Sequence, residues 1–261
     1  MTALRRIALG WAAAAAVLAA GACVFVLDDP SGFAAGVRRD LHRIVAFQPG
    51  GTLSLRHLDG DIEIRGWDRD EIEMIAESQA GDGLWNPGSG RPRFDIEESP
   101  ERLTIRTRWE GDAAGARPVR IFLSVPRSLI IEEASTQAGG IAIADLYGQA
   151  RVSILEGDLA VENFSGGLSA AIGRGRIRAE ILDLRRGDEV SLTVREGDVW
   201  LALEPAVSAV VEAEAPDGVS ADWDLPEGAR QAKLKLGAGE ASIAVKTGAG
   251  KIELRRTPET S

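Results

Sequence analysis

The sequence predicts an all-β protein: a single-stranded β-solenoid, or β-helix, of stacked short strands with glycine turns, preceded by one N-terminal transmembrane helix. Three observations predict this fold. Five glycines recur at intervals of nine residues, at Gly139, Gly148, Gly157, Gly166 and Gly175. Between them apolar residues alternate with polar ones and do not recur at helical spacing. One long apolar run lies near the amino terminus.

The repeat defines a rung. Two nine-residue units make one rung of eighteen residues, with a turn at each glycine, because glycine tolerates the positive φ angles of tight turns. After Gly175 the next glycines are Gly187 and Gly197, so we expect a longer third rung in which residues 183–188 bulge from a turn.

The alternating pattern extends beyond the regular repeat. Upstream, five apolar pairs predict strands: Leu53 and Leu55, Ile62 and Ile64, Ile72 and Met74, Leu103 and Ile105, and Ile121 and Leu123. Polar stretches at 81–92 and 110–118 predict loops. A glycine followed by a strand also occurs at 60–64, 197–201 and 250–254. We therefore predict one continuous β domain over residues 44–256, after a linker at 31–43.

Residues 1–30 form a predicted membrane anchor. Arg5 and Arg6 precede an apolar run from Ile7 to Leu27, and twenty-one helical residues rise by ~31 Å, which matches a bilayer core. The basic flank places the rest of the chain across the membrane. A cleaved signal peptide, or a lipoprotein segment lipidated at Cys23, are the alternatives. We favour the anchor because the apolar run continues past Cys23, the only cysteine.

Several of these sequence segments resemble a known protein family. The glycine-turn-strand segments, the Val125-Pro126 lead-in and the membrane segment resemble the bacterial putative-adhesin β-strand-repeat family of unknown function, over residues 44–255. The resemblance implies an extracytoplasmic single-stranded β-solenoid and transfers no catalytic residue. The chain departs from the most regular members in its spacing after Gly175.

Stacked rungs predict a ladder of charges. Residues in register lie about 4.8 Å apart. Two rows then alternate acid, base and acid: Glu156, Arg174 and Glu196 in one, and Asp158, Arg176 and Asp198 in the other. Pairing of opposite charges on adjacent strands supports register, so we favour a structural role. An anionic-ligand patch made of Arg174, Arg176 and Arg178 is the alternative.

Trp200 and Arg178 are candidate surface contacts. Trp200 lies between Val199 and Leu201, so alternation places it on the outer face, where it can stack on a sugar or contact a protein. Cover of Trp200 by residues 183–188 or by the C-terminal strands is the structural alternative, and we favour it.

No cofactor, metal or catalytic site is predicted. Each acidic turn offers at most two carboxylates, too few for the calcium sites of β-rolls. The two histidines, His42 and His57, suggest no zinc site. Residues 167–171 lack the nucleophile-elbow pattern, and residues 248–252 lack the Ser/Thr of a phosphate loop. The net charge of −10 disfavours nucleic acid.

The sequence therefore predicts a non-enzymatic protein of the bacterial envelope. Its adhesin-like β-repeat domain is expected outside the cytoplasm, anchored in the cytoplasmic membrane, for binding or scaffolding at the cell surface. The expected partner is an envelope protein or glycan. One alternative is a carbohydrate-active β-helix enzyme, which requires a groove along one sheet with clustered carboxylates or basic residues. Another is a self-polymerising scaffold joined end to end.

Overall fold

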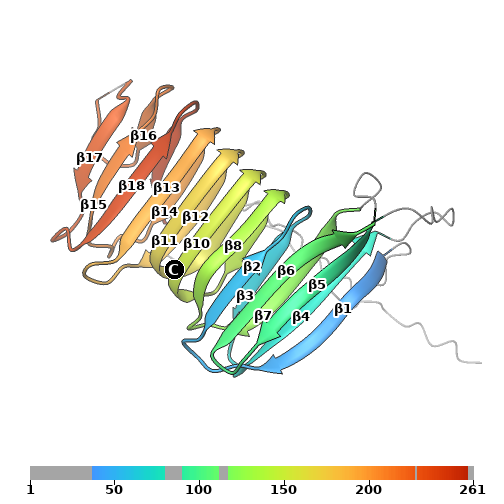
Figure 1. Cartoon of the computed structure of the whole chain (residues 1–261). Coiled ribbons are helices and arrows are strands. Elements are labelled where there is room, and N and C mark those ends of the chain that lie inside the picture. Colours follow the sequence, from blue (N-terminus) through green and yellow to red (C-terminus); the bar gives the residue numbers. More distant parts are fainter. Residues whose placement is uncertain (1–36, 80–89, 112–116, 227, 258–261) are drawn as a thin grey trace, which may run out of the picture. The chain divides into compact units, whose positions relative to one another are not determined.

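The computed structural model describes residues 37–79, 90–111, 117–226 and 228–257, and these form 19 strands of one sheet (Figure 1). The described part is all-β and contains no helix, so it offers none that could cross a membrane. The predicted anchor at residues 1–30, with Cys23, lies outside the described residues.

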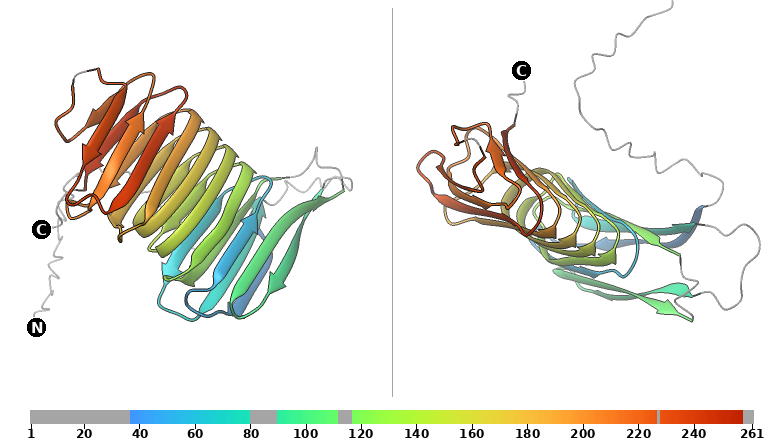
Figure 2. Two further views of the ribbon diagram at one scale, coloured as in Figure 1. Left: turned by 60° about the vertical axis from the view of Figure 1, so that its left-hand side comes forward. Right: turned by 90° about the horizontal axis from the view of Figure 1, so that it is seen from above.

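The sheet curls almost into a closed tube with two broad faces, as Figure 2 shows along two directions. Face A contains, in spatial order, β5 (Arg91–Glu98), β6 (Arg102–Glu110), β2 (Thr52–Arg56), β8 (Ile130–Ala138), β10 (Tyr147–Glu156), the second half of β11 (Leu159–Arg174), β13 (Glu189–Glu196), β18 (Ala241–Thr247), β15 (Ala209–Glu214) and β17 (Gln231–Lys235). Face B contains β1 (Val37–Ala46), β4 (Glu71–Gln79), β7 (Val119–Pro126), β3 (Ile62–Trp67), β9 (Ile141–Ala144), the first half of β11, β12 (Ile177–Asp183), β14 (Val199–Leu203), β19 (Ile252–Arg256) and β16 (Val219–Ala221).

The central strands are parallel and keep the register that the glycine spacing predicts. Tyr147 of β10 pairs with Ser165 of β11, eighteen residues later. The next pairing on face A joins Arg174 to Glu196, twenty-two residues later. The extra residues form the turn around Gly187 between β12 and β13, as expected.

At both ends of the stack the spatial order departs from the order of the chain. Strands β2 and β3 lie between the β6–β7 pair and the β8–β9 pair. Strands β18 and β19 likewise lie between β13–β14 and β15–β16. The sequence indicated one continuous domain but not this order, because a repeat pattern does not say which copies become neighbours.

The amino-terminal boundary of the domain was predicted too late. Residues 37–43, assigned to the linker 31–43, belong to β1, which pairs antiparallel with β4. The register of β1 shifts between Arg39 and Leu41, so its polar residues break the alternation that marks a strand. In the predicted loop 81–92, residues 81–89 lie outside the described part, whereas Arg91 and Pro92 begin β5.

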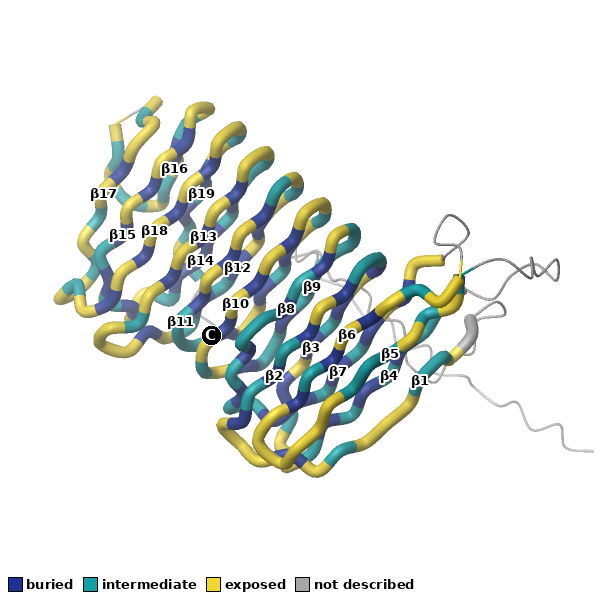
Figure 3. Tube along the Cα trace, in the orientation of Figure 1, coloured by how far each residue is buried: buried dark blue, intermediate teal, exposed yellow. Residues whose placement is uncertain are grey.

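The core lies between the two faces. Along each central strand buried and exposed residues alternate, as the colours of Figure 3 show. Residues in register form continuous buried rows, for example Ile62, Ile141, Leu159, Ile177, Val199 and Ile252. Each fully buried Leu, Ile or Val contributes about 1.5–3 kcal/mol through removal of apolar surface from water.

The glycines lie at the corners between the faces. Gly139, Gly157 and Gly175 separate strands of face A from strands of face B, and all have positive φ. Gly148 and Gly166 lie inside β10 and β11, and the chain bends within β11, whose partner changes from β12 to β13 between Ser165 and Leu168. Their φ angles are also positive, but ladder pairing continues through them, since Gly148 pairs with Gly166.

One corner holds a column of glycines in van der Waals contact with backbone. We call it the glycine column; its members are Gly60, Gly139, Gly157, Gly175, Gly197 and Gly250. A Cβ atom on Gly175 would overlap the carbonyl oxygen of Gly157, and one on Gly157 would overlap that of Gly139. Every turn therefore occupies the space that a side chain on the next turn would need.

We expect Gly175→Ala to lower the free energy of unfolding by about 4 kcal/mol or more, since a side chain there combines positive φ with overlap of backbone. Urea unfolding followed by circular dichroism measures the change.

Gly187→Ala is the matched control. Gly187 also has positive φ (86°), but a Cβ atom there would meet open space. This variant should lose only about 1–2 kcal/mol. Equal losses in the two variants would show that close approach in the glycine column does not limit stability.

Candidate functional site

The first predicted charge row lies on exposed corners of three successive strands. Arg174 lies between Glu156 and Glu196: its Nη1 is 2.8 Å from Glu156 Oε1 and its Nε is 3.2 Å from Glu196 Oε2. The hydrogen bond to Glu196, with the charge of Glu156, raises the pKa of Arg174. All three side chains are more than half exposed, so the row is a surface network.

In the second row Asp158, Arg176 and Asp198 lie on successive rungs, as the register predicts. Arg176 forms an ion pair with Asp158 at 2.8 Å, whereas Asp198 hydrogen-bonds to the next rung. There Asp198 Oδ1 accepts the backbone N–H of Lys251 at 2.9 Å. Asp158 Oδ1 accepts that of Arg176 in the same way, at 2.8 Å.

The aspartates that follow column glycines therefore hold the next turn in place. Asp61, which follows Gly60, accepts the N–H of Gly140 at 2.8 Å. Each such carboxylate satisfies a backbone donor at a corner, where ladder hydrogen bonding is interrupted. No group of three or more metal-ligating side chains occurs among residues 37–79, 90–111, 117–226 and 228–257.

Arg178 and Trp200 contact each other. They are register partners on β12 and β14, and the guanidinium carbon lies 3.9 Å from the centroid of the indole ring. On its other side Trp200 pairs with Glu253 of the C-terminal strand β19. The indole is half-buried on the outer face, and a cation–π contact holds it there. Cover by C-terminal strands was expected; the Arg178 contact was not.

A long hollow, which we call the trough, crosses the outer side of face A. Each strand contributes a short stretch near its end, and two hollows of about 1130 and 670 Å³ meet at Thr193 and Arg195. The stretches are 56–58, 106–108, 135–137, 153–155, 171–173, 193–195, 214–216, 230–231 and 246–248, with Asp95, Glu97 and Glu133 at the β5 end. At about 4.8 Å per strand, the trough runs for roughly 40 Å.

Small outward side chains form the floor of the trough. Ser153, Ala171 and Thr193 are neighbours in register on β10, β11 and β13. Gly173 lies beside them, next to the backbone of Leu155. The Leu155 side chain is 54% exposed and borders the trough. Sequence reasoning missed this site, although the small residues at outward positions of three successive rungs were a usable signal.

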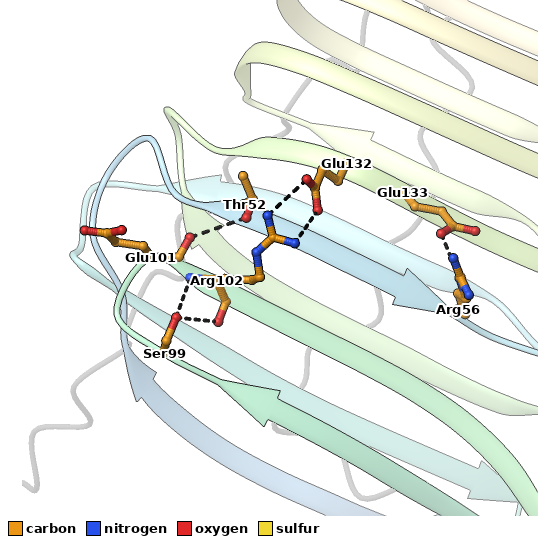
Figure 4. A network of polar contacts seen from close by, with 7 residues as sticks. All are labelled: Thr52, Arg56, Ser99, Glu101, Arg102, Glu132 and Glu133. Carbon is orange, nitrogen blue, oxygen red and sulfur yellow. Dashed lines mark hydrogen bonds and ion pairs between the residues drawn. The ribbon is translucent and has the colours of Figure 1, made fainter.

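Two ion pairs connect the strands around β2 (Figure 4): Arg56–Glu133 lies in the trough, whereas Arg102–Glu132 lies outside it. Arg56 of β2 pairs with Glu133 of β8 at 2.7 Å. Arg102 of β6 reaches Glu132 of β8 at 3.1 Å, across the strand that lies between them. The register shift in β8 puts these two consecutive glutamates at half-buried positions beside their arginines. Both pairs join β2 and its neighbours.

Among the described residues, the other half of the trough contains three cations, of which one has an acidic partner: Lys246 pairs with Glu214 at 3.2 Å. Arg195 and Arg230 form no ion pair with any residue that the structure describes. The Nη2 of Arg195 lies 3.0 Å from the position that a Cβ of Gly173 would take, so its guanidinium lies along the floor.

His57 is buried at the corner beneath the trough. Its Nε2 donates to the carbonyl oxygen of Val119 at 2.8 Å, which leaves Nδ1 to accept from the Thr107 hydroxyl at 2.8 Å. Burial lowers the pKa of His57, although the contact with Val119 opposes this shift. Both nitrogens are engaged in structural hydrogen bonds, so His57 offers no free group to a ligand.

Comparisons with known proteins find structural similarity at low identity. No model of a known protein family and no curated protein matches the chain. A crystal structure of a "putative cell adhesion protein" from Clostridium sporogenes has 15% identity, coverage of 84% of this chain and 100% of its own, and a TM-score of 0.46. A "putative adhesin" from Bacteroides fragilis has 9% identity, coverage of 85% and 98%, and a TM-score of 0.26. A "putative lipid binding protein" from Parabacteroides distasonis has 10% identity, coverage of 84% and 97%, and a TM-score of 0.24. These sequence identities and TM-scores are too low to support an inference about function.

We expect Arg174→Glu to lower the melting temperature by about 2 °C, since three like charges would then adjoin in one row. Adding Glu156→Arg and Glu196→Arg should restore it, and thermal unfolding measures both. Arg151→Glu, on an exposed position of β10, is the control for the change in net charge. An equal loss in that control would contradict a role for the row.

The burial of His57 predicts a pH dependence of stability. Its folded pKa lies below the ordinary value of 6.5, so the unfolded chain binds the proton more readily. The stabilisation is complete above the unfolded pKa and is lost as the pH falls below it. The melting temperature should therefore fall between about pH 7.5 and 5, by more than in His57→Gln, which keeps a donor to Val119.

The comparison with His57→Gln isolates the contribution of His57, because the rest of the chain is unchanged in that variant. The same slope in His57→Gln and the wild type would contradict the assignment to His57.

Proposed function

We propose that the chain is a non-enzymatic binding protein of the bacterial envelope, whose trough takes an elongated polar ligand. We further propose that its β domain is a single-stranded β-solenoid, anchored through residues 1–30 in the cytoplasmic membrane and lying outside the cytoplasm. The partner would be an envelope glycan or protein. The parallel register and the glycine column support the β-solenoid. The apolar run at Ile7–Leu27 supports the membrane anchor.

The trough is the observation that carries the proposal. It is open along its length and crosses the strands of face A from β5 to β17. One row of its floor carries the hydroxyl groups of Ser135, Ser153 and Thr193, interrupted by Ala171, and Leu155 is exposed beside it. Such a surface suits a long ligand that lies across the strands, because each rung adds an outward side chain about 4.8 Å from the last.

A β-helix enzyme requires a groove with clustered carboxylates or bases, and the β5 end of the trough gathers both kinds of group. Each carboxylate there has an arginine partner: Glu133 with Arg56 at 2.7 Å, Glu97 with Arg106 at 3.9 Å, and Asp95 with Arg108. Such pairing favours a structural role over proton transfer, which needs a carboxyl group able to change its charge at working pH. We therefore retain the non-enzymatic proposal.

The edge strands give little support to a self-polymerising scaffold. Proline occurs in the edge strand β5, and the edge strand β1 has a register shift. Edge strand β16 is only three residues long, and β17 carries Lys233 and Lys235. Prolines, bulges, short strands and lysines are the features by which proteins oppose pairing at sheet edges.

Filling the trough should abolish ligand retention. We expect immobilised full-length protein in detergent to retain a component of the envelope fraction, and Ala171→Trp to reduce that retention at least about tenfold, because the indole would occupy the floor. Quantified pull-down, with thermal unfolding to check the fold, measures the effect.

Ala160→Trp is the matched control, since Ala160 is an outward residue of the same strand on face B. It should retain the component as the wild type does. Retention unaffected by Ala171→Trp would rule out the trough as the binding site.

A further inference from the structure

We propose that the half of the trough around Arg195 binds a linear acidic polysaccharide, with Arg195 and Arg230 pairing its carboxylates. This inference rests on the proposed function and names the class of ligand. Its basis is the distribution of charge, the position of the Arg195 guanidinium and the spacing of hydroxyl groups.

The trough is locally basic in an acidic protein. The chain has a net charge of −10. The trough is nevertheless lined by six cations, Arg56, Arg106, Arg108, Arg195, Arg230 and Lys246, and by four carboxylates, Asp95, Glu97, Glu133 and Glu214. A local excess of positive charge attracts an anionic ligand to this part of an otherwise acidic protein.

The excess charge lies in the half of the trough from β13 to β17. At the β5 end Arg56, Arg106 and Arg108 each have a carboxylate partner. Within the described part of the chain, Arg195 and Arg230 have none. These two guanidinium groups are therefore available to an incoming carboxylate without the loss of an existing ion pair.

The orientation of Arg195 suits a ligand on the floor. Its guanidinium lies over Gly173, where the missing side chain leaves room. A larger residue than glycine does not fit at position 173, because its Cβ atom would lie 2.5 Å from the carbonyl oxygen of Leu155. A planar guanidinium held along the floor can donate two parallel hydrogen bonds to one carboxylate.

The remaining groups suit a polyhydroxylated chain. Ser135, Ser153 and Thr193 occupy one outward row of the trough, and each hydroxyl both donates and accepts hydrogen bonds. Leu155 adds an exposed apolar contact next to that row. Ala171 separates Ser153 from Thr193, and Ser135 already donates to Glu133 at 3.3 Å. An elongated glycan can reach the hydroxyl groups on both sides of Ala171, whereas a compact ligand reaches fewer of them.

Two other polymer classes fit less well. An extended peptide gains affinity by pairing with backbone at a free sheet edge, but the trough lies on a face whose backbone is already paired. Single-stranded nucleic acid needs aromatic side chains for base stacking, and the trough residues include no phenylalanine, tyrosine or tryptophan.

Polygalacturonate and its methyl ester provide a direct test, because they share one backbone and differ in carboxylate charge. We expect full-length protein in detergent to bind polygalacturonate, more weakly as salt rises, and to bind the methyl ester at least about tenfold more weakly. Isothermal titration calorimetry measures both. Equal affinity for the two polymers, or binding of polyphosphate but not of polygalacturonate, would overturn the proposal.

Arg195→Gln should weaken polygalacturonate binding about tenfold. Arg151→Gln is the control: Arg151 is exposed on the same face and has no ion pair within the described residues, but it does not line the trough. Equal weakening by both variants would show non-specific attraction and refute the site. If polygalacturonate fails to bind while Ala171→Trp still abolishes envelope retention, the ligand class is wrong and the proposed binding function stands.

Discussion

The close approach of backbone to backbone in the glycine column governs the rest of the structure. The carbonyl oxygen of one corner occupies the space of a missing Cβ in the next, as between Gly157 and Gly175. The corners therefore stack without an intervening side chain, and neighbouring strands can keep ladder spacing up to the bend. The aspartates that follow three of these glycines satisfy donors of the next corner, which adds a directional contact to the steric one.

Register set at the corners decides which outward side chains become neighbours. One row brings acids and Arg174 together, another brings Arg178 onto Trp200, and a third brings Ser153, Ala171 and Thr193 together. The first row is held by ion pairs and the second by a cation–π contact. The third has side chains too small to fill the surface, and a trough results. The first two rows support the fold, whereas the third leaves space beside Arg195 that is available to a ligand.

The ends of the stack impose a different constraint on folding. Strands β2 and β3 lie between strands that follow them by tens of residues in the chain. Their final place requires non-local pairing on both sides, which is slow because loop closure must precede it. The pairs Arg56–Glu133 and Arg102–Glu132 join β2 and its neighbours across the outer surface (Figure 4). Exposed pairs of this kind add little stability, but they fit one register better than its alternatives.

The sequence by itself determined the strand-rich class, the inward row containing Ile141, Leu159 and Ile177, and the eighteen-residue register, because alternation and glycine spacing are local properties. The sequence also determined that Arg174 lies between two glutamates, because this arrangement follows from the register alone. The spatial order of the end rungs, the strand at 37–43 and the trough were decided only by tertiary structure. Which copies of a repeat become neighbours depends on non-local pairing energies, and a hollow depends on the relative sizes of side chains that meet across strands. Neither is expressed in the pattern of a single strand.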